Sequence, residues 1–165
     1  MSNRRKKSER GNATIEFALV FLPLTLMMLG IVEVSRIAWL HQTLAMSVKT
    51  IARQAVVHGE KCVEAAPSCA KTVAAWVDLM KANAVGMDPA SMQLTFASGS
   101  TTKTCSPATS CANDGSVWPP ESDNGVGLPI TIRGTYAMSP FYWFAGSSTN
   151  GKWVLAAAAQ EVIQF

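Results

Sequence analysis

The stretch FALVFLPLTLMMLGIV at residues 17–32 decides the fold of this 165-residue chain, because it holds sixteen consecutive residues without a charge. Residues 13–15 extend it to nearly the length of about 20 that crosses a bilayer as a helix, with Glu16 as the one charged exception. The sequence therefore predicts a single membrane-spanning helix near the N-terminus.

The basic residues of the chain are concentrated before this run. Residues 1–11 hold five Arg and Lys residues against Glu9, a net charge of +4, whereas the whole chain carries +3 and the remainder therefore −1. Positive charges beside a span stay on the cytoplasmic side, so we expect the N-terminus in the cytoplasm and the chain after about residue 35 outside. A nucleic-acid partner is not expected, because its phosphates need a basic folded surface rather than a basic tail.

Two simpler readings compete with a specialised membrane helix. A cleaved secretory signal has a shorter apolar core, about 7–15 residues, followed by a small-residue cleavage site. Here the run ends in EVSRIAW at residues 33–39, which offers no such site. A plain uncleaved anchor fits the composition equally well. Glu16 distinguishes a plain anchor from a specialised one. A carboxylate inside the span costs about 2.5–3.5 kcal/mol, so Glu16 must either pair with a cation or reach the lipid headgroups.

The residues around Glu16 also form a motif: Gly11, four residues, Glu16, the aromatic Phe17 and then the apolar run. With the basic leader, this resembles the class III signal of type IV pilin-like proteins, and most closely the TadE-like minor pseudopilins of the tight-adherence (Flp) pilus machinery. The resemblance implies that a prepilin peptidase cuts after Gly11 and that Asn12 becomes the new N-terminus. It also implies that Glu16 and Phe17 serve assembly, with Glu16 meeting the terminal amine of an adjacent subunit.

The helix is predicted to continue beyond the membrane. Apolar residues recur there at three- and four-residue steps, namely Ile37, Leu40, Leu44, Val48, Ile51 and Ala55. Such a stripe serves either as core against a following domain or as a seam between subunits. We therefore divide the chain into a leader at 1–11, a transmembrane and stalk helix at 12–58, and a head at 59–165.

The head is predicted to be small and mixed. Residues 71–85 suit a second helix, residues 91–97 and 128–138 alternate like strands, and residues 101–127 read as loop. Residues 153–165 combine helix-favouring alanines with strand-favouring ends, and the family resemblance favours a closing strand. The expected fold class is α+β: a long N-terminal transmembrane and stalk helix with a small periplasmic head, in which the second helix packs on a short antiparallel sheet.

Four cysteines lie outside the apolar run, with six residues between Cys62 and Cys69 and five between Cys105 and Cys111. In an oxidising periplasm this spacing suits two local disulfides, Cys62–Cys69 and Cys105–Cys111, among three possible connectivities. A four-thiolate zinc site is the alternative, but zinc pairs are usually separated by about two to four residues. We expect no metal.

No catalytic motif, phosphate loop or metalloprotease signature is present in the sequence, so we expect no enzyme, no cofactor and no small-molecule substrate. The resemblance implies a structural subunit of a bacterial inner membrane, whose partners are a prepilin peptidase and other pilin-like and Tad assembly subunits. It leaves open whether the subunit enters the extracellular pilus. The rival hypotheses are a tethered adhesin or scaffold that uses the FYWF loop at 141–144, and an anchored enzyme.

Overall fold

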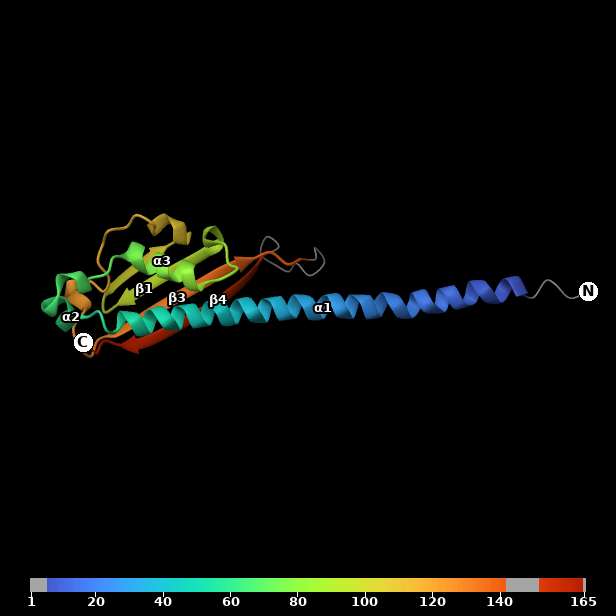
Figure 1. The fold of residues 1–165 in the computed structure, drawn as a ribbon, viewed down its shortest axis with the longest axis horizontal. Helices are drawn as coiled ribbons and strands as arrows, with labels where there is room; N and C mark the ends of the chain where they lie inside the picture. Colours follow the sequence, from blue (N-terminus) through green and yellow to red (C-terminus); the bar gives the residue numbers. More distant parts are fainter. Residues whose placement is uncertain (1–5, 142–151, 165) are drawn as a thin grey trace, which may run out of the picture. The chain divides into compact units, whose positions relative to one another are not determined.

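The N-terminal helix, α1, spans Lys6–Ala55 as one element of 50 residues (Figure 1). The computed structural model describes residues 6–141 and 152–164, and gives the backbone alone for residues 6–12 and for Pro67. The helix begins six residues before the predicted start at Asn12, because the Lys, Glu and Arg residues of the leader favour helix. It ends three residues before the predicted end, in a turn closed by the bond from the His58 N–H to the Ala55 carbonyl (3.0 Å).

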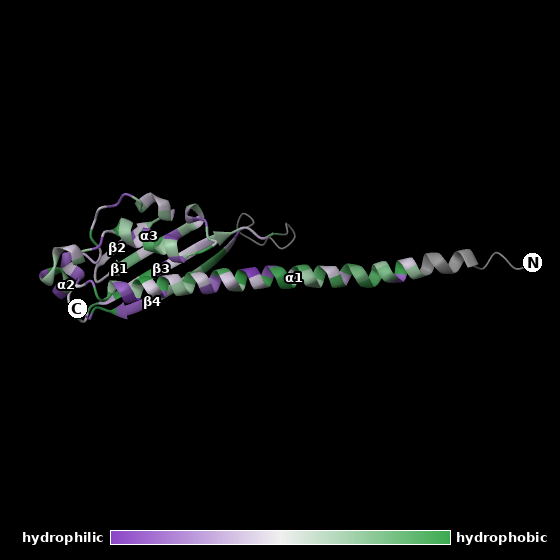
Figure 2. Cartoon of the chain, in the orientation of Figure 1, coloured by the Kyte–Doolittle hydropathy of each residue, from purple (hydrophilic) through white to green (hydrophobic). Residues whose placement is uncertain are grey.

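The chain divides into two units, Met1–Ala38 and Trp39–Phe165. The described part of the first unit is helical throughout, and Figure 2 shows most of it in the hydrophobic colours. Among residues 6–141 and 152–164, α1 is the one helix long and apolar enough to cross a membrane. The predicted membrane-spanning helix is therefore present as an α-helix of the required length.

The second unit is built on a four-stranded antiparallel sheet in the order β2-β1-β3-β4. Its strands are β1 Met92–Ser98, β2 Thr101–Cys105, β3 Pro129–Met138 and β4 Trp153–Val162. The predicted strands at 91–97 and 128–138 are confirmed, as is the preference for a strand near the C-terminus. The prediction of an irregular loop for all of residues 101–127 is wrong, because β2 occupies its beginning and pairs with β1.

Along β1 and β3, one face of the sheet is buried and the other faces outward. On β3, Ile130, Ile132, Gly134, Tyr136 and Met138 are buried, while the residues between them are exposed or half-buried. The same period of two runs through β1. The alternation in the sequence therefore marks the face that packs on the helices.

Two helices cover this buried face: residues 39–55 of α1 and α3, Val73–Asn83 (Figure 1). A Cβ on Gly134 would lie within 3.5 Å of side chains from both helices. The core that they enclose contains the α1 residues Leu40, Leu44, Val48, Ile51 and Ala55, together with Val73, Trp76, Val77, Met80, Leu94, Phe96 and Trp118. The apolar stripe of α1 from Leu40 onward is therefore core rather than a seam between subunits.

Short elements complete the second unit. They are α2 Glu60–Ala65 and the 3₁₀ turns η1 Pro67–Cys69, η2 Pro89–Ser91, η3 Ala108–Cys111 and η4 Glu121–Asp123. Within the predicted second helix at 71–85, α3 starts at its cap Thr72, whose hydroxyl accepts a bond from the Ala75 N–H. The predicted aromatic loop at 141–144 lies outside the described residues from Tyr142 onward. Together the helices and strands give the expected α+β fold with a long N-terminal helix.

Candidate assembly segment and disulfide-bonded head

The predicted processing site lies on α1. Gly11 and Asn12 have helical backbone. Glu16 follows Gly11 by five residues, or about 7.5 Å along a helix axis. The residues implied in cleavage and assembly therefore share one short, continuous helical segment.

Glu16 and Phe17 are both exposed on this helix. The Phe17 ring stacks on Phe21 with centroids 5.5 Å apart. Large apolar side chains surround the helix on all sides, and between Ile15 and Val34 the exposed ones show 48–72% of their surface. A soluble protein rarely leaves so much contiguous apolar surface in water, so this surface has to be covered by lipid or by other helices.

A charged pair lies near the end of the apolar run. The Arg36 guanidinium donates to the Glu33 carboxylate at 2.8 Å, one helical turn away, and the Glu33 side chain is 8% exposed. The two opposite charges offset each other, which lowers the cost of holding either beside an apolar segment.

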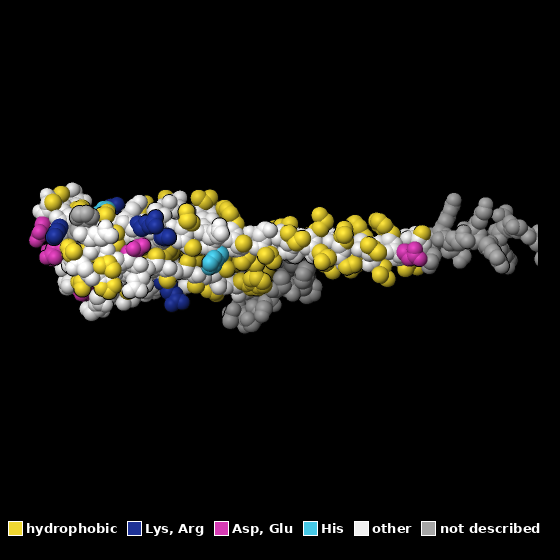
Figure 3. Space-filling model, turned by 90° about the horizontal axis from the view of Figure 1, so that it is seen from below, with side chains coloured by type: hydrophobic (Ala, Val, Ile, Leu, Met, Phe, Trp, Pro, Cys, Tyr) yellow, Lys and Arg dark blue, Asp and Glu magenta, His cyan; other side chains and the backbone are white. Residues whose placement is uncertain are grey.

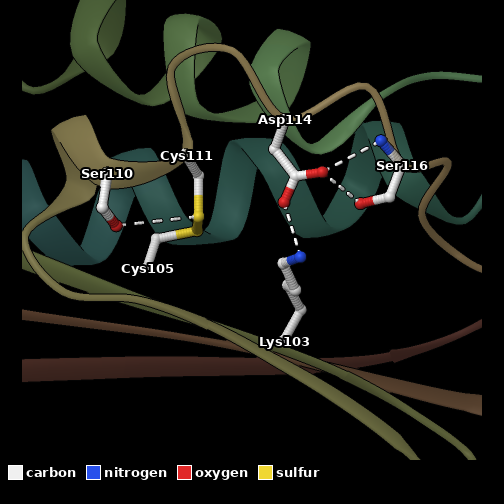
Figure 4. The surroundings of a disulfide bond; sticks show 6 residues. All are labelled: Lys103, Cys105, Ser110, Cys111, Asp114 and Ser116. Carbon is white, nitrogen blue, oxygen red and sulfur yellow. Dashed lines mark hydrogen bonds and ion pairs between the residues drawn. A yellow bond between two sulfur atoms is a disulfide. The ribbon is translucent and has the colours of Figure 1, made fainter.

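The structure contains two disulfides, Cys62–Cys69 and Cys105–Cys111, with Cα atoms 5.8 Å and 5.6 Å apart. Cys105 ends β2 and Cys111 ends η3, and both are buried, whereas Cys62 and Cys69 are half-buried. Figure 4 shows the Cys105–Cys111 bond joining the strand to the loop above it. Because all four sulfurs are bonded to one another, none remains as a thiolate for the alternative zinc site.

Polar contacts hold the same loop beside the disulfide (Figure 4). Lys103 on β2 donates to the Asp114 carboxylate at 2.6 Å, and the Ser116 hydroxyl and N–H donate to its other oxygen at 2.6 Å and 3.0 Å. These bonds, with that of Lys103 the strongest, hold the pKa of Asp114 well below its usual value. The loop after β2 is thus fastened at both Cys111 and Asp114.

The structure does not bring all the predicted site residues together, because the Gly11–Phe17 segment lies in the first unit and the disulfides in the second. The Lys103–Asp114 pair and the bonds of Asp123 to the Thr101 N–H and hydroxyl (3.2 Å and 2.7 Å) were not predicted. Sequence offers no signal for contacts between residues so far apart. In the described parts of both units, no three His, Cys, Asp or Glu side chains form a group that could hold a metal ion.

In a comparison with known protein families, the model of the family described as "TadE-like protein" matches residues 11–53. The match begins at Gly11 and includes the apolar run and most of the buried stripe of α1. The resemblance is confirmed over this segment, while residues 54–165 lie beyond it. Comparisons with curated proteins and with solved structures gave no match for the chain.

Proposed function

We propose that this chain, TadE-like over residues 11–53, is a minor pseudopilin: a structural, non-enzymatic subunit required to build a tight-adherence (Flp) pilus. The observation that carries the proposal is the exposed apolar part of α1 with Glu16 five residues after Gly11, inside the family match. In this function α1 first spans the inner membrane and later packs against the helices of neighbouring subunits.

The charge distribution supports one orientation in the membrane. The leader at 1–11 carries +4 and stays in the cytoplasm by the positive-inside rule, so the second unit is in the periplasm. Two disulfides in the second unit agree with an oxidising compartment.

Cleavage after Gly11 has an electrostatic consequence. It removes the +4 leader and leaves an α-amino group on Asn12, four residues before Glu16 of the same chain. A carboxylate within the span costs about 2.5–3.5 kcal/mol. An amine about 4 Å away on an adjacent subunit returns about 4 kcal/mol at an effective dielectric constant of about 20. The two charges thus offset the burial cost only when subunits align, which sets the register between helices.

Processing is tested by co-expressing the full chain with a prepilin peptidase and measuring its intact mass. We expect the loss of residues 1–11 and an N-terminal sequence that starts at Asn12. Gly11→Ala should block the loss, whereas Gly30→Ala is the matched control, since a Cβ at Gly30 meets nothing within 4 Å. An uncut wild-type chain would refute the pseudopilin proposal and favour the tethered adhesin or scaffold.

Assembly is tested separately, in cells that build the pilus. Glu16→Gln keeps the shape of the side chain and removes its charge, so it should leave cleavage intact and sharply reduce the number of pili seen by electron microscopy. Glu64→Gln is the matched control on the exposed surface of α2. Normal piliation of the Glu16→Gln strain would overturn the amine–carboxylate mechanism without affecting the processing result.

A further inference from the structure

One end of the second unit carries its exposed aromatic side chains. Of the aromatic residues that the structure describes between Trp39 and Phe165, Trp39 and Phe141 are the exposed ones, at 53% and 77%. Val85 beside them in the fold is 62% exposed. Three large apolar side chains from separate parts of the chain thus face solvent.

The fold brings these residues to the same end. The Trp39 ring lies 2.8 Å from where a Cβ on Gly86 would be, which places it against the loop that carries Val85. The Asp88 N–H of this loop donates to the Tyr136 hydroxyl (3.4 Å), near the end of β3, and Phe141 follows three residues after that strand. We call this surface, formed by Trp39, Val85 and Phe141, the apolar end.

The opposite end of the second unit is acidic. Among the described residues it holds Glu60 and Glu64 of α2, Glu121 and Asp123 of η4, and Glu161 near the end of β4, against the basic residues Lys61, Lys71 and Arg53. Figure 3 shows acidic side chains gathered at this end, where α2 and the C-terminus lie. At the apolar end, the described charged residues of the strands and of the loop are Asp88 and Lys152, one of each sign. The second unit is therefore polarised between an acidic end and an apolar one.

The short length of helix between the membrane span and Trp39 indicates what the apolar end contacts. Residues 13–32 are long enough to cross a bilayer core of about 30 Å, and Trp39 follows Val32 by seven residues, about 10 Å of helix. The headgroup layer that flanks the core is the depth at which Trp side chains are enriched. Because the Trp39 ring lies against Gly86, the residue after Val85, Val85 is held near the depth of Trp39.

We propose that the apolar end of the second unit docks on the lipid headgroup layer of the membrane that α1 spans, with Trp39, Val85 and Phe141 in contact with lipid. The proposal rests on the membrane anchoring of α1 described under the proposed function. The acidic end then points away from the anionic lipid surface, where repulsion is smallest. Docking by this end keeps the apolar side chains out of water while α1 is in the bilayer.

The test uses the full chain in vesicles of phosphatidylethanolamine and phosphatidylglycerol. Because the native cysteines are bonded in pairs, a new cysteine takes up a thiol-reactive environment-sensitive fluorophore alone. Val85→Cys reports the apolar end, and Val126→Cys is the matched control. Val126 is also exposed (47%) and lies in the turn three residues before β3, a strand whose ten residues span about 30 Å. Leu26→Cys, within the apolar run, reports anchoring.

We expect the Val85→Cys label to shift its emission to the blue and to lose intensity when lipids carry a quencher near the headgroup. The Val126→Cys label should do neither. Docking on lipid is overturned if the Val85→Cys label behaves like the control. It is also overturned if the label shifts to the blue without being quenched, since another protein rather than lipid then covers it. Failure of the Leu26→Cys label to respond to a quencher deep in the bilayer would instead overturn the membrane anchoring, and the docking with it.

Discussion

At Gly134 the sheet lies close to both helices that cover it, so substitution of this glycine tests the packing of the second unit. A Cβ there would lie 3.0 Å from Val48 Cγ2, 3.1 Å from Leu44 Cδ1 and 3.5 Å from Met80 Cε. All three side chains are fully buried, so a shift that admits the new Cβ moves them against other core atoms rather than into solvent. Gly134→Ala should therefore overpack the core.

The expected size follows from two opposing terms. Overpacking a well-filled core costs about 1–3 kcal/mol. Replacing glycine in a strand returns about 0.5–1 kcal/mol of backbone entropy. The net loss is about 0–2.5 kcal/mol in the free energy of unfolding, a fall of up to roughly 10 °C in the melting temperature of a unit of this size.

Thermal unfolding of the full chain in detergent, followed by near-ultraviolet circular dichroism, measures this loss, because Trp76 and Trp118 lie in the same core. Gly115→Ala is the matched control: a Cβ at Gly115 meets nothing within 4 Å, so it should be neutral or stabilising by up to about 1 kcal/mol. A melting temperature for Gly134→Ala at or above that of Gly115→Ala would refute the reasoning. Combining Val48→Ala with Gly134→Ala should cost less than the sum of the single changes, since the truncation makes room for the new Cβ.

Two further changes probe the head. Replacing the Cys105–Cys111 pair by alanines should lower the melting temperature more than replacing the Cys62–Cys69 pair. Loss of either disulfide removes about 2 kcal/mol of chain-entropy stabilisation, but Cys105 and Cys111 are also buried in the core. Equal losses measured by calorimetry would contradict this packing role. Because the pKa of Asp114 is lowered in the folded state, the ionised Asp114 stabilises the fold fully above its unfolded pKa near 4, and this stabilisation is lost as the pH falls below that value. The melting temperature of Asp114→Asn should therefore depend less on pH between about 2 and 5 than that of the wild type. An unchanged slope of melting temperature against pH would refute this.

Much of the fold was predictable because apolar residues recur in most elements with the period of a helix or of a strand. The stripe of α1, the amphipathic pattern of α3 and the alternation of β1 and β3 all follow from which side chains face the core. Strand β2 was missed because TTKTC carries no apolar alternation, and its strand form depends on pairing with β1. In β4 the run of alanines favours helix locally, and ten paired residues along β3 override that preference.

The sequence by itself determined the apolar segment, the basic leader and the Gly11–Phe17 motif, because each is a property of a short continuous stretch of chain. The spacing of the cysteines also predicted the two disulfides that the structure contains. Only the tertiary structure decided how Lys103 meets Asp114 and that Trp39, Val85 and Phe141 share one end. The physical reason is the antiparallel pairing of β1 with β3. Its register brings the loop after α3 to the end of β3, and no local pattern encodes a contact between residues so distant in the chain.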